Sequence, residues 1–165
     1  MPDWPGERIR AALATASRHR AFARAGRPSA IGWATVELDR AARELAADLG
    51  LTHEAFAPAV DSLALGARCR VATDALAGGL ALAILEPATE GRLAAILARH
   101  GEGPAAIWFA ADDATAEDAT ADDATRAPGP GASPGPFGPE RPVRGGPDGG
   151  PSWFLIGTGT GTIPT

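Results

Sequence analysis

The chain has 165 residues and a formal net charge of -5 at pH 7, and 45% of its residues are hydrophobic. This length suits one modest domain, and the negative charge argues against nonspecific binding of DNA or RNA, which depends on Lys and Arg neutralising phosphates. All fifteen basic residues are Arg, and Lys, Asn, Gln and Tyr are absent, which excludes Lys Schiff bases, Tyr acids and amide oxyanion holes.

Residues 1–28 predict an N-terminal helical extension. The apolar residues Ile9, Leu13 and Ala16 recur at helical spacing and form a weak stripe. The segment also carries six Arg against one Asp and one Glu, a balance that would suit a targeting segment or a surface for an acidic partner. We favour the plain helical extension over both.

Residues 29–113 predict the folded unit, which begins with a strand and a helix. The run 31–38 (IGWATVEL) is typical of a strand. Asp39 is the predicted N-cap of a helix over 40–49, and Gly50 ends that helix because glycine adopts the left-handed conformation of the C′ position.

The middle of this unit predicts a loop followed by a hairpin. Residues 51–66 have helix-like apolar spacing, but Pro58 interrupts any long helix, so we predict a loop with one helical turn. The runs 67–72 (ARCRVA) and 80–86 (LALAILE) then predict two strands that pair as a hairpin.

A helix and a last strand complete the folded unit. Thr89 is the predicted N-cap of a helix over 90–99, which the glycines of residues 100–103 end. Residues 105–111 (AAIWFAA) predict the fourth strand. The predicted order is therefore βαβββ, with a helical connection before the last strand.

The C-terminal part of the chain is of low complexity. Three acidic pentads occupy 112–126, and Gly and Pro dominate the residues that follow. The pentads could bind a hard cation but lack the turn glycine of a calcium loop, so we predict a disordered linker over 114–151. Residues 152–165 form a strand-like tail, in which 152–156 (SWFLI) predicts a returning edge strand.

The segments IGWATVELDRAARELAADLG and LALAILEPATEGRLAAILARHGEGPAAIWFAADD resemble the first half of methylmalonyl-CoA epimerases and related vicinal oxygen chelate proteins. The Leu-Glu-Pro at 85–87 and the Gly-Glu-Gly at 101–103 follow the family's order and spacing. The resemblance implies an α+β fold with one βαβββ module and a mixed, curved sheet. Family members typically fold two such modules into a cup that holds a divalent metal.

The resemblance also implies where metal ligands would stand. The family's ligands on the first strand, before the Leu-Glu-Pro turn and on the last strand map to Ala30, Ala83 and Ala106. Alanine cannot bind a metal ion or accept a proton. We therefore predict a degenerate module with no catalytic residue, no metal and no cofactor.

Strand alternation, applied to the resemblance, predicts one smooth face lining the cup. We expect this apolar face to bind an apolar small molecule or a second copy of the chain in a homodimer. The residues of the predicted ligand pocket are Ala30, Gly32, Ala34, Ala83, Leu85, Ala106 and Trp108.

Two other functions stay open. The first is a metal-dependent lyase or epimerase of the superfamily, acting on a small acyl-CoA or oxo-acid-type substrate, with a divalent metal held by His53, His100 or the acidic pentads. The second is a non-enzymatic interaction protein that uses its basic N-terminal helix and acidic tail. The first is not favoured because no histidine lies at metal-ligand spacing from another ligand type in a shared element, and for the second the sequence identifies no partner.

Three further residues have ordinary structural interpretations. His100 follows a helix, where it suits the helix dipole better than a role as general base beside Glu102. Alternation directs Glu86 away from the cup. It also sends Cys69 to the face opposite its Arg neighbours, as a buried thiol. With one Cys and no run of roughly 18 apolar residues, we predict a cytoplasmic protein without a membrane span.

Overall fold

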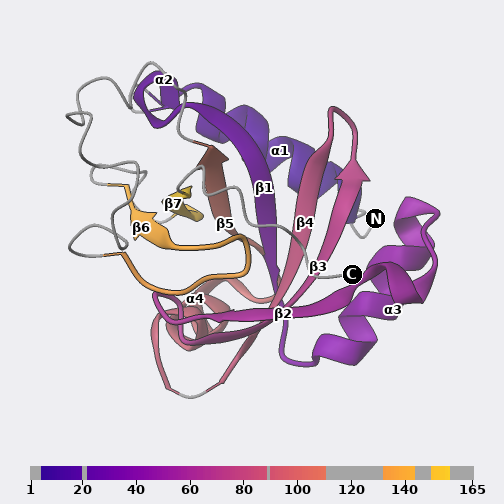
Figure 1. Cartoon of the computed structure of the whole chain (residues 1–165). Coiled ribbons are helices and arrows are strands. Elements are labelled where there is room, and N and C mark those ends of the chain that lie inside the picture. The colour runs from indigo at the N-terminus through magenta and orange to yellow at the C-terminus, as the bar shows by residue number, and fades with distance from the viewer. Residues whose placement is uncertain (1–4, 20–21, 89, 111–131, 144–149, 157–165) are drawn as a thin grey trace.

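The computed structural model describes residues 5–19, 22–88, 90–110, 132–143 and 150–156. Figure 1 labels the helices and strands that these residues form. They are α1 (Pro5–Ser17), α2 (Phe22–Ala25), β1 (Arg27–Ala34), α3 (Leu38–Leu49), the 3-10 turn η1 (His53–Ala55), β2 (Ala57–Ser62), β3 (Ala67–Leu76), β4 (Leu80–Pro87), α4 (Arg92–His100), β5 (Gly103–Ala110), β6 (Glu140–Pro142) and β7 (Ser152–Ile156).

The strands form one mixed sheet in the order β2-β3-β4-β1-β5-β7-β6. On one side of the centre, β1 pairs in parallel with β4, which is followed by β3 and β2 in antiparallel pairing. On the other side, β5 pairs in parallel with β7, which pairs antiparallel with β6. The halves meet where β1 and β5 run antiparallel. The predicted α+β fold with a βαβββ module is confirmed, and a second, shorter half accompanies it.

The assignment of strands to the module needs correction. Residues 57–62, predicted within a loop, form strand β2, so the module consists of β1, α3, β2, β3 and β4. The signal was missed because β2 is an edge strand whose residues are mostly exposed; it therefore shows no clear alternation and tolerates Pro58. The strand predicted as the fourth of the module is β5, which opens the second half.

Several element ends also differ from the predictions. Strand β1 spans Arg27–Ala34 instead of 31–38, and α3 begins at Leu38, so Asp39 lies in its first turn and pairs with Arg70 at 2.6 Å instead of capping. Gly50 ends α3 with φ of 69°, as expected. Helix α4 begins at Arg92, and its predicted cap Thr89 lies outside the described residues.

The C-terminal predictions are partly corrected. The predicted linker 114–151 includes β6, because Glu140 and its neighbours pair with β7. Residues 152–156 do form a strand, but β7 lies between β5 and β6 and is not an edge strand. The acidic pentads lie outside the described residues. No helix in the described part of the chain is long and apolar enough to cross a membrane.

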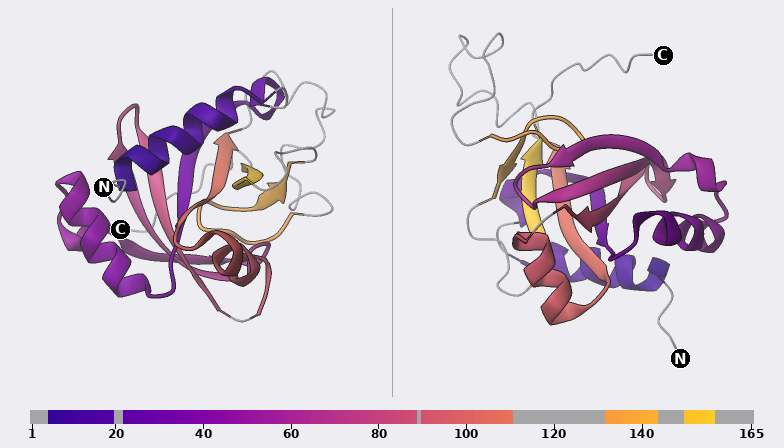
Figure 2. Two further views of the ribbon diagram at one scale, coloured as in Figure 1. Left: turned by 180° about the vertical axis from the view of Figure 1, so that it is seen from behind. Right: turned by 90° about the horizontal axis from the view of Figure 1, so that it is seen from below.

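Two helices cover the convex side of the sheet. Figures 1 and 2 show α1 lying across β1 and β5, with α3 beside β3 and β4. Ile9 of α1 and Leu45 of α3 are 2% and 1% exposed, and both pack in one cluster with Ile107 and Trp153 of the sheet. The predicted N-terminal extension is therefore helical and is also part of the core.

The sheet curls until its two edge strands meet on the concave side. Ser62 at the end of β2 donates a hydrogen bond from Oγ to Glu140 Oε1 of β6. The backbone N–H of Leu63 donates to Pro134 O at 3.1 Å. Because these bonds join strands from opposite edges, the concave side is enclosed by the chain itself.

Candidate functional site: the concave face and its rim

The seven residues predicted to line the cup do share the concave face of the sheet. Register pairs Gly32 with Ala83 on one side and with Ala106 on the other, and pairs Ala30 with Trp108. The pairing register therefore brings these residues together on one face of the sheet. All seven are buried, and the six with side chains belong to a single cluster in which each is at most 1% exposed.

Aromatic rings fill the space over this face. A Cβ atom added to Gly32 would lie 2.7 Å from Leu85 Cδ1 and 2.9 Å from the Trp108 ring. The Trp108 ring also contacts Phe137 and stacks on Phe154, with centroids 5.0 and 5.8 Å away. These residues therefore form a packed core. That they bind a ligand stays a prediction.

The three positions that the resemblance assigns to metal ligands come together in the structure. Ala83 and Ala106 flank Gly32, and Ala30 lies two residues along the same strand. Their methyl groups are buried at 0–1% exposure and offer no lone pair. A metal ion of the family's kind does not fit these residues. In the part of the chain that the structure describes, no three His, Cys, Asp or Glu residues are grouped so as to hold one.

The histidines lie apart from the concave face. His19 follows α1 and packs edge-on against Trp153 at 5.4 Å between ring centroids, on the convex side. His53 begins η1, and its side chain lies outside the described part. His100 is the exposed last residue of α4. The histidine ligands considered for a metal-dependent enzyme are thus on different elements.

A buried carboxylate on the concave side, Glu140, was not predicted. Its residue is 0% exposed, Oε1 accepts from Ser62, and Oε2 accepts from Trp108 Nε1 at 2.7 Å. Burial raises the pKa of the Glu140 carboxyl, while the bonds from Ser62 and Trp108 act in the opposite direction. Glu140 belongs to edge strand β6 and bonds to Ser62 at the end of edge strand β2, which indicates a role in closing the sheet.

Sequence reasoning missed Glu140 because it stands in a run dominated by Gly and Pro. One signal was present in that run. Phe137 is the single aromatic residue of 114–151, and an isolated large apolar side chain in a polar segment is typical of an anchor on a core. Phe137 indeed packs on Trp108 and brings Glu140 with it.

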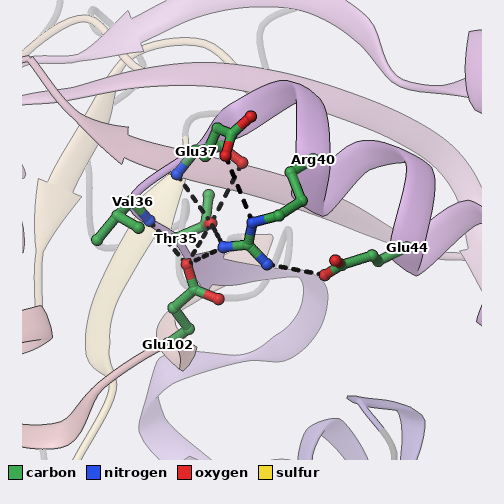
Figure 3. A network of polar contacts seen from close by, with 6 residues as sticks. All are labelled: Thr35, Val36, Glu37, Arg40, Glu44 and Glu102. Atoms are coloured by element: carbon green, nitrogen blue, oxygen red, sulfur yellow. Dashed lines mark hydrogen bonds and ion pairs between the residues drawn. The ribbon is translucent and has the colours of Figure 1, made fainter.

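A second polar cluster lies at the rim, where β1 ends (Figure 3). Glu102 Oε1 accepts hydrogen bonds from the Val36 amide at 2.9 Å, Thr35 Oγ1 at 2.7 Å and Arg40 Nη2 at 2.5 Å. Arg40 also pairs with Glu44 at 2.9 Å and with Glu37 at 3.6 Å. The cluster therefore joins the start of α3 to the loop that precedes β5.

The hydrogen bonds of this cluster determine the charge of Glu102. Burial by itself would raise the pKa of the Glu102 carboxyl, but the bonds from Val36, Thr35 and Arg40 together hold it below its usual value. The same contact raises the pKa of the Arg40 guanidinium. Glu102 is therefore ionised at neutral pH, in contrast to the tendency of Glu140.

An open apolar groove lies beside this cluster, at the end of the curled sheet where α4 packs. Its volume is about 360 Å³. Val36, at 65% exposure, lies on one side, and α4 lies on the other. The lining residues are Val36, Pro87, Ala94, Leu97, Ala98, Gly101 and Glu102. None of them belongs to the predicted pocket set.

Glu86 and Cys69 point in the directions that the alternation of side chains along a strand predicts. Glu86 is directed away from the concave face and pairs with Arg68 of the neighbouring strand at 2.9 Å. Cys69 is 4% exposed on the concave side, and burial raises the pKa of its thiol to about 12. Such a thiol is unreactive at neutral pH. Neither residue is placed for catalysis.

The strand order, the parallel pairs on both sides of the centre and the curled closure define a vicinal oxygen chelate-like fold, so the resemblance is confirmed at the level of the fold. The chain is similar to methylmalonyl-CoA epimerase of Streptomyces coelicolor in complex with 2-nitronate-propionyl-CoA, with 26% identity, a TM-score of 0.54 and coverage of 80% of this chain and 96% of that chain. Its likeness to the Mycobacterium tuberculosis epimerase has a TM-score of 0.58 at 18% identity and covers 80% and 87%.

A hypothetical protein from Bacillus halodurans is also similar in fold, with a TM-score of 0.57, 15% identity and coverage of 84% and 98% of the two chains. No family model matches the sequence. No curated protein matches it either. The structural likeness therefore rests on fold and on modest identity.

Proposed function

We propose that this protein is a metal-free, non-catalytic member of the vicinal oxygen chelate fold that binds a small apolar molecule. The loss of ligands supports the first part, because the three positions that converge at the centre of the concave face all carry alanine. The sequence predicts that the ligand binds to the concave face that lines the cup. The packed core there would have to open, so the groove beside α4 is the better placed site.

The single observation that carries this proposal is the packing around Gly32. The Trp108 ring occupies the space over Gly32, between Ala83 and Ala106. A metal ion and a substrate bound there would need both donor atoms and room, and these residues supply neither.

The testing experiment is the metal content of protein purified without chelator or affinity tag, measured by mass spectrometry. We expect less than about 0.1 metal ion per chain, since a structural or catalytic site would be close to full occupancy. Stoichiometric zinc, cobalt, nickel or manganese would contradict the proposal. It would favour the alternative, a metal-dependent lyase or epimerase, with His53 and His100 as the first residues to substitute.

A homodimer remains part of the proposal, on a different surface from the one first considered. The concave face was expected to need a partner, but the described residues cover it from within the chain. The edge strand β2 and the turn after it instead present Val60 and Leu63, which are 59% and 66% exposed. Light scattering distinguishes the cases: a mass near 33 kDa, twice the chain mass of 16.7 kDa, supports the dimer, and the single-chain mass contradicts it.

The alternative of an interaction protein needs an experiment that leaves α1 in place. Because Ile9 and Ala16 of α1 are each 2% exposed, removing residues 1–28 would damage the core as well as any binding surface. Replacing exposed Arg10 and Arg18 with Ala instead tests whether the basic helix surface binds an acidic partner while the core stays intact.

A further inference from the structure

The groove beside α4 has apolar walls and one ionised group. Leu97, Ala94 and Pro87 supply hydrocarbon surface, and Glu102 is the one charged residue among those that line it. A volume of about 360 Å³ lies at the lower end of the range for small-molecule sites. The groove therefore suits a compact molecule whose body is apolar.

One oxygen of Glu102 is held rigidly and the other is available. All three hydrogen bonds reach Oε1, and Oε2 has no hydrogen-bond partner among the described residues (Figure 3). A carboxylate fixed in this way does not lose side-chain freedom when it accepts a further bond. Because Glu102 is one of the residues that line the groove, Oε2 is the oxygen of this carboxylate that is left to accept a bond from a ligand there.

The surrounding charge favours a cation at that acceptor. Arg40 is shared by Glu37, Glu44 and Glu102, so the cluster keeps an excess of negative charge. Helix α4 ends at His100, and the groove is lined by Ala98 and Gly101 at that end, where the helix dipole is negative. The basic side chains of Arg99 and His100 are exposed and do not line the groove.

We propose that the groove beside α4 binds a small lipophilic ammonium ion, with its apolar body against α4 and Pro87 and its charged nitrogen at Glu102 Oε2. This inference rests on the proposed function, because it names the chemistry of the apolar ligand. A neutral molecule of the same shape gains the apolar contact but lacks the ion pair, and a carboxylate is repelled by Glu102. The expected order of affinity is cation, then alcohol, then anion.

The test uses three probes of matched shape: 2-phenylethylammonium, 2-phenylethanol and 3-phenylpropionate. Each is titrated into the full-length protein at pH 7, and binding is followed from backbone amide shifts in two-dimensional NMR spectra. We expect shifts at Val36 and Gly101, and about fivefold tighter binding of the ammonium than of the alcohol, as an exposed ion pair allows. About 1 M salt should reduce that ratio towards one.

Two variants on one helix control for the site. Ala98→Trp fills the groove from α4 and should abolish the binding of both the ammonium and the alcohol. Ala95→Trp carries the same bulk on the exposed side of α4 away from the groove and should leave binding unchanged. Glu102→Gln should remove the preference for the ammonium while the alcohol still binds, provided that circular dichroism shows the fold intact.

The outcomes separate the two proposals. Equal affinity of ammonium and alcohol, both lost in Ala98→Trp, overturns the ammonium inference and leaves apolar binding at the groove intact. Absence of binding of either probe overturns both. If Ala95→Trp and Ala98→Trp weaken the ammonium equally, the cation binds elsewhere and the inference is wrong.

Discussion

The two halves of the sheet share one plan but are completed differently. In the first half, β1, β2, β3 and β4 come with their own helix α3, which covers the convex face. In the second half, the described residues hold β5, β6 and β7 but no helix between β5 and β6. There α1, from the opposite end of the sequence, packs on β5 through Ile9. The two parts of the convex face are therefore packed against helices from different places in the sequence, because an apolar sheet face is buried wherever an apolar helix stripe meets it.

In the two halves, the pKa of one carboxyl is shifted up and the pKa of another is shifted down. Glu102, at the junction before β5, is held ionised by Arg40 and by two further hydrogen bonds. Glu140, on β6, is buried with neutral partners, and its pKa is raised. The first stabilises a rim by charge, and the second closes a core by hydrogen bonding. Substitutions should therefore respond to pH in opposite directions.

The largest effect is expected where α1 packs on the second half of the sheet. Ile9→Asp puts a charge into the convex core at a position 2% exposed and should cost about 3–5 kcal/mol of unfolding free energy. Urea denaturation measures it. Ala11→Asp on the exposed face of the same helix is the matched control and should cost under about 1 kcal/mol. If the two variants lose equal unfolding free energy, the packing of α1 against the sheet does not contribute to stability.

The next effect tests whether the concave side is packed or open. Gly32→Ala places a methyl group 2.7 Å from Leu85 and 2.9 Å from Trp108, so overpacking should cost about 1–3 kcal/mol. In Gly6→Ala of α1, the added Cβ meets no atom within 4 Å beyond its own helix backbone and chain neighbours. This variant should lose no unfolding free energy. Thermal unfolding of both variants gives the comparison. If Gly32→Ala does not change the stability, the concave face has room for a ligand.

A smaller effect concerns the closure by Glu140. The folded-state pKa of Glu140 is raised, so the native state binds more protons than the unfolded state, and its contribution to stability is lost as pH rises above about 4.5. In Gln, the amide oxygen can accept from Trp108 Nε1 and the amide NH2 can donate to Ser62 Oγ, so both contacts persist without a charge once the Ser62 hydroxyl turns to accept. The stability of Glu140→Gln relative to the wild type should therefore increase as pH rises from 4 to 7. A difference independent of pH would contradict the raised pKa.

The smallest effect is expected at the rim. The folded-state pKa of Glu102 is lowered, so its stabilisation is present above pH 4.5 and is lost as pH falls through that lowered value. Glu102→Gln should cost about 1 kcal/mol at pH 7 and less in acid. Glu44→Gln, which removes an exposed pair with Arg40, should cost about 0.3–0.5 kcal/mol. If Glu102→Gln and Glu44→Gln lose equal unfolding free energy at pH 7, the hydrogen bonds to Glu102 stabilise the protein no more than an exposed ion pair does.

Local patterns predicted much of the first half correctly. The buried run of β4 and the glycine that ends α3 are read from a few adjacent residues, because burial on both faces and a left-handed φ each restrict the residue types allowed. The residues on the concave face followed from alternation along strands. Strand β2 escaped because an exposed edge strand imposes little pattern, and β6 escaped because three residues are too few to show one.

By itself, the sequence determined the α+β fold class, the apolar character of the strands that form the concave face and the alanines at the three positions that the resemblance assigns to metal ligands, since residue types and alternation suffice for these. Only the tertiary structure decided that the face is closed by the chain's own Phe137 and Glu140, that α1 covers the second half, and that Glu102 meets Arg40 beside an apolar groove. Trp108 and Phe137 are 29 positions apart, Arg40 and Glu102 are 62 apart, and Ser62 and Glu140 are 78 apart. No local pattern specifies such pairs, because they form when the curled sheet brings distant segments together.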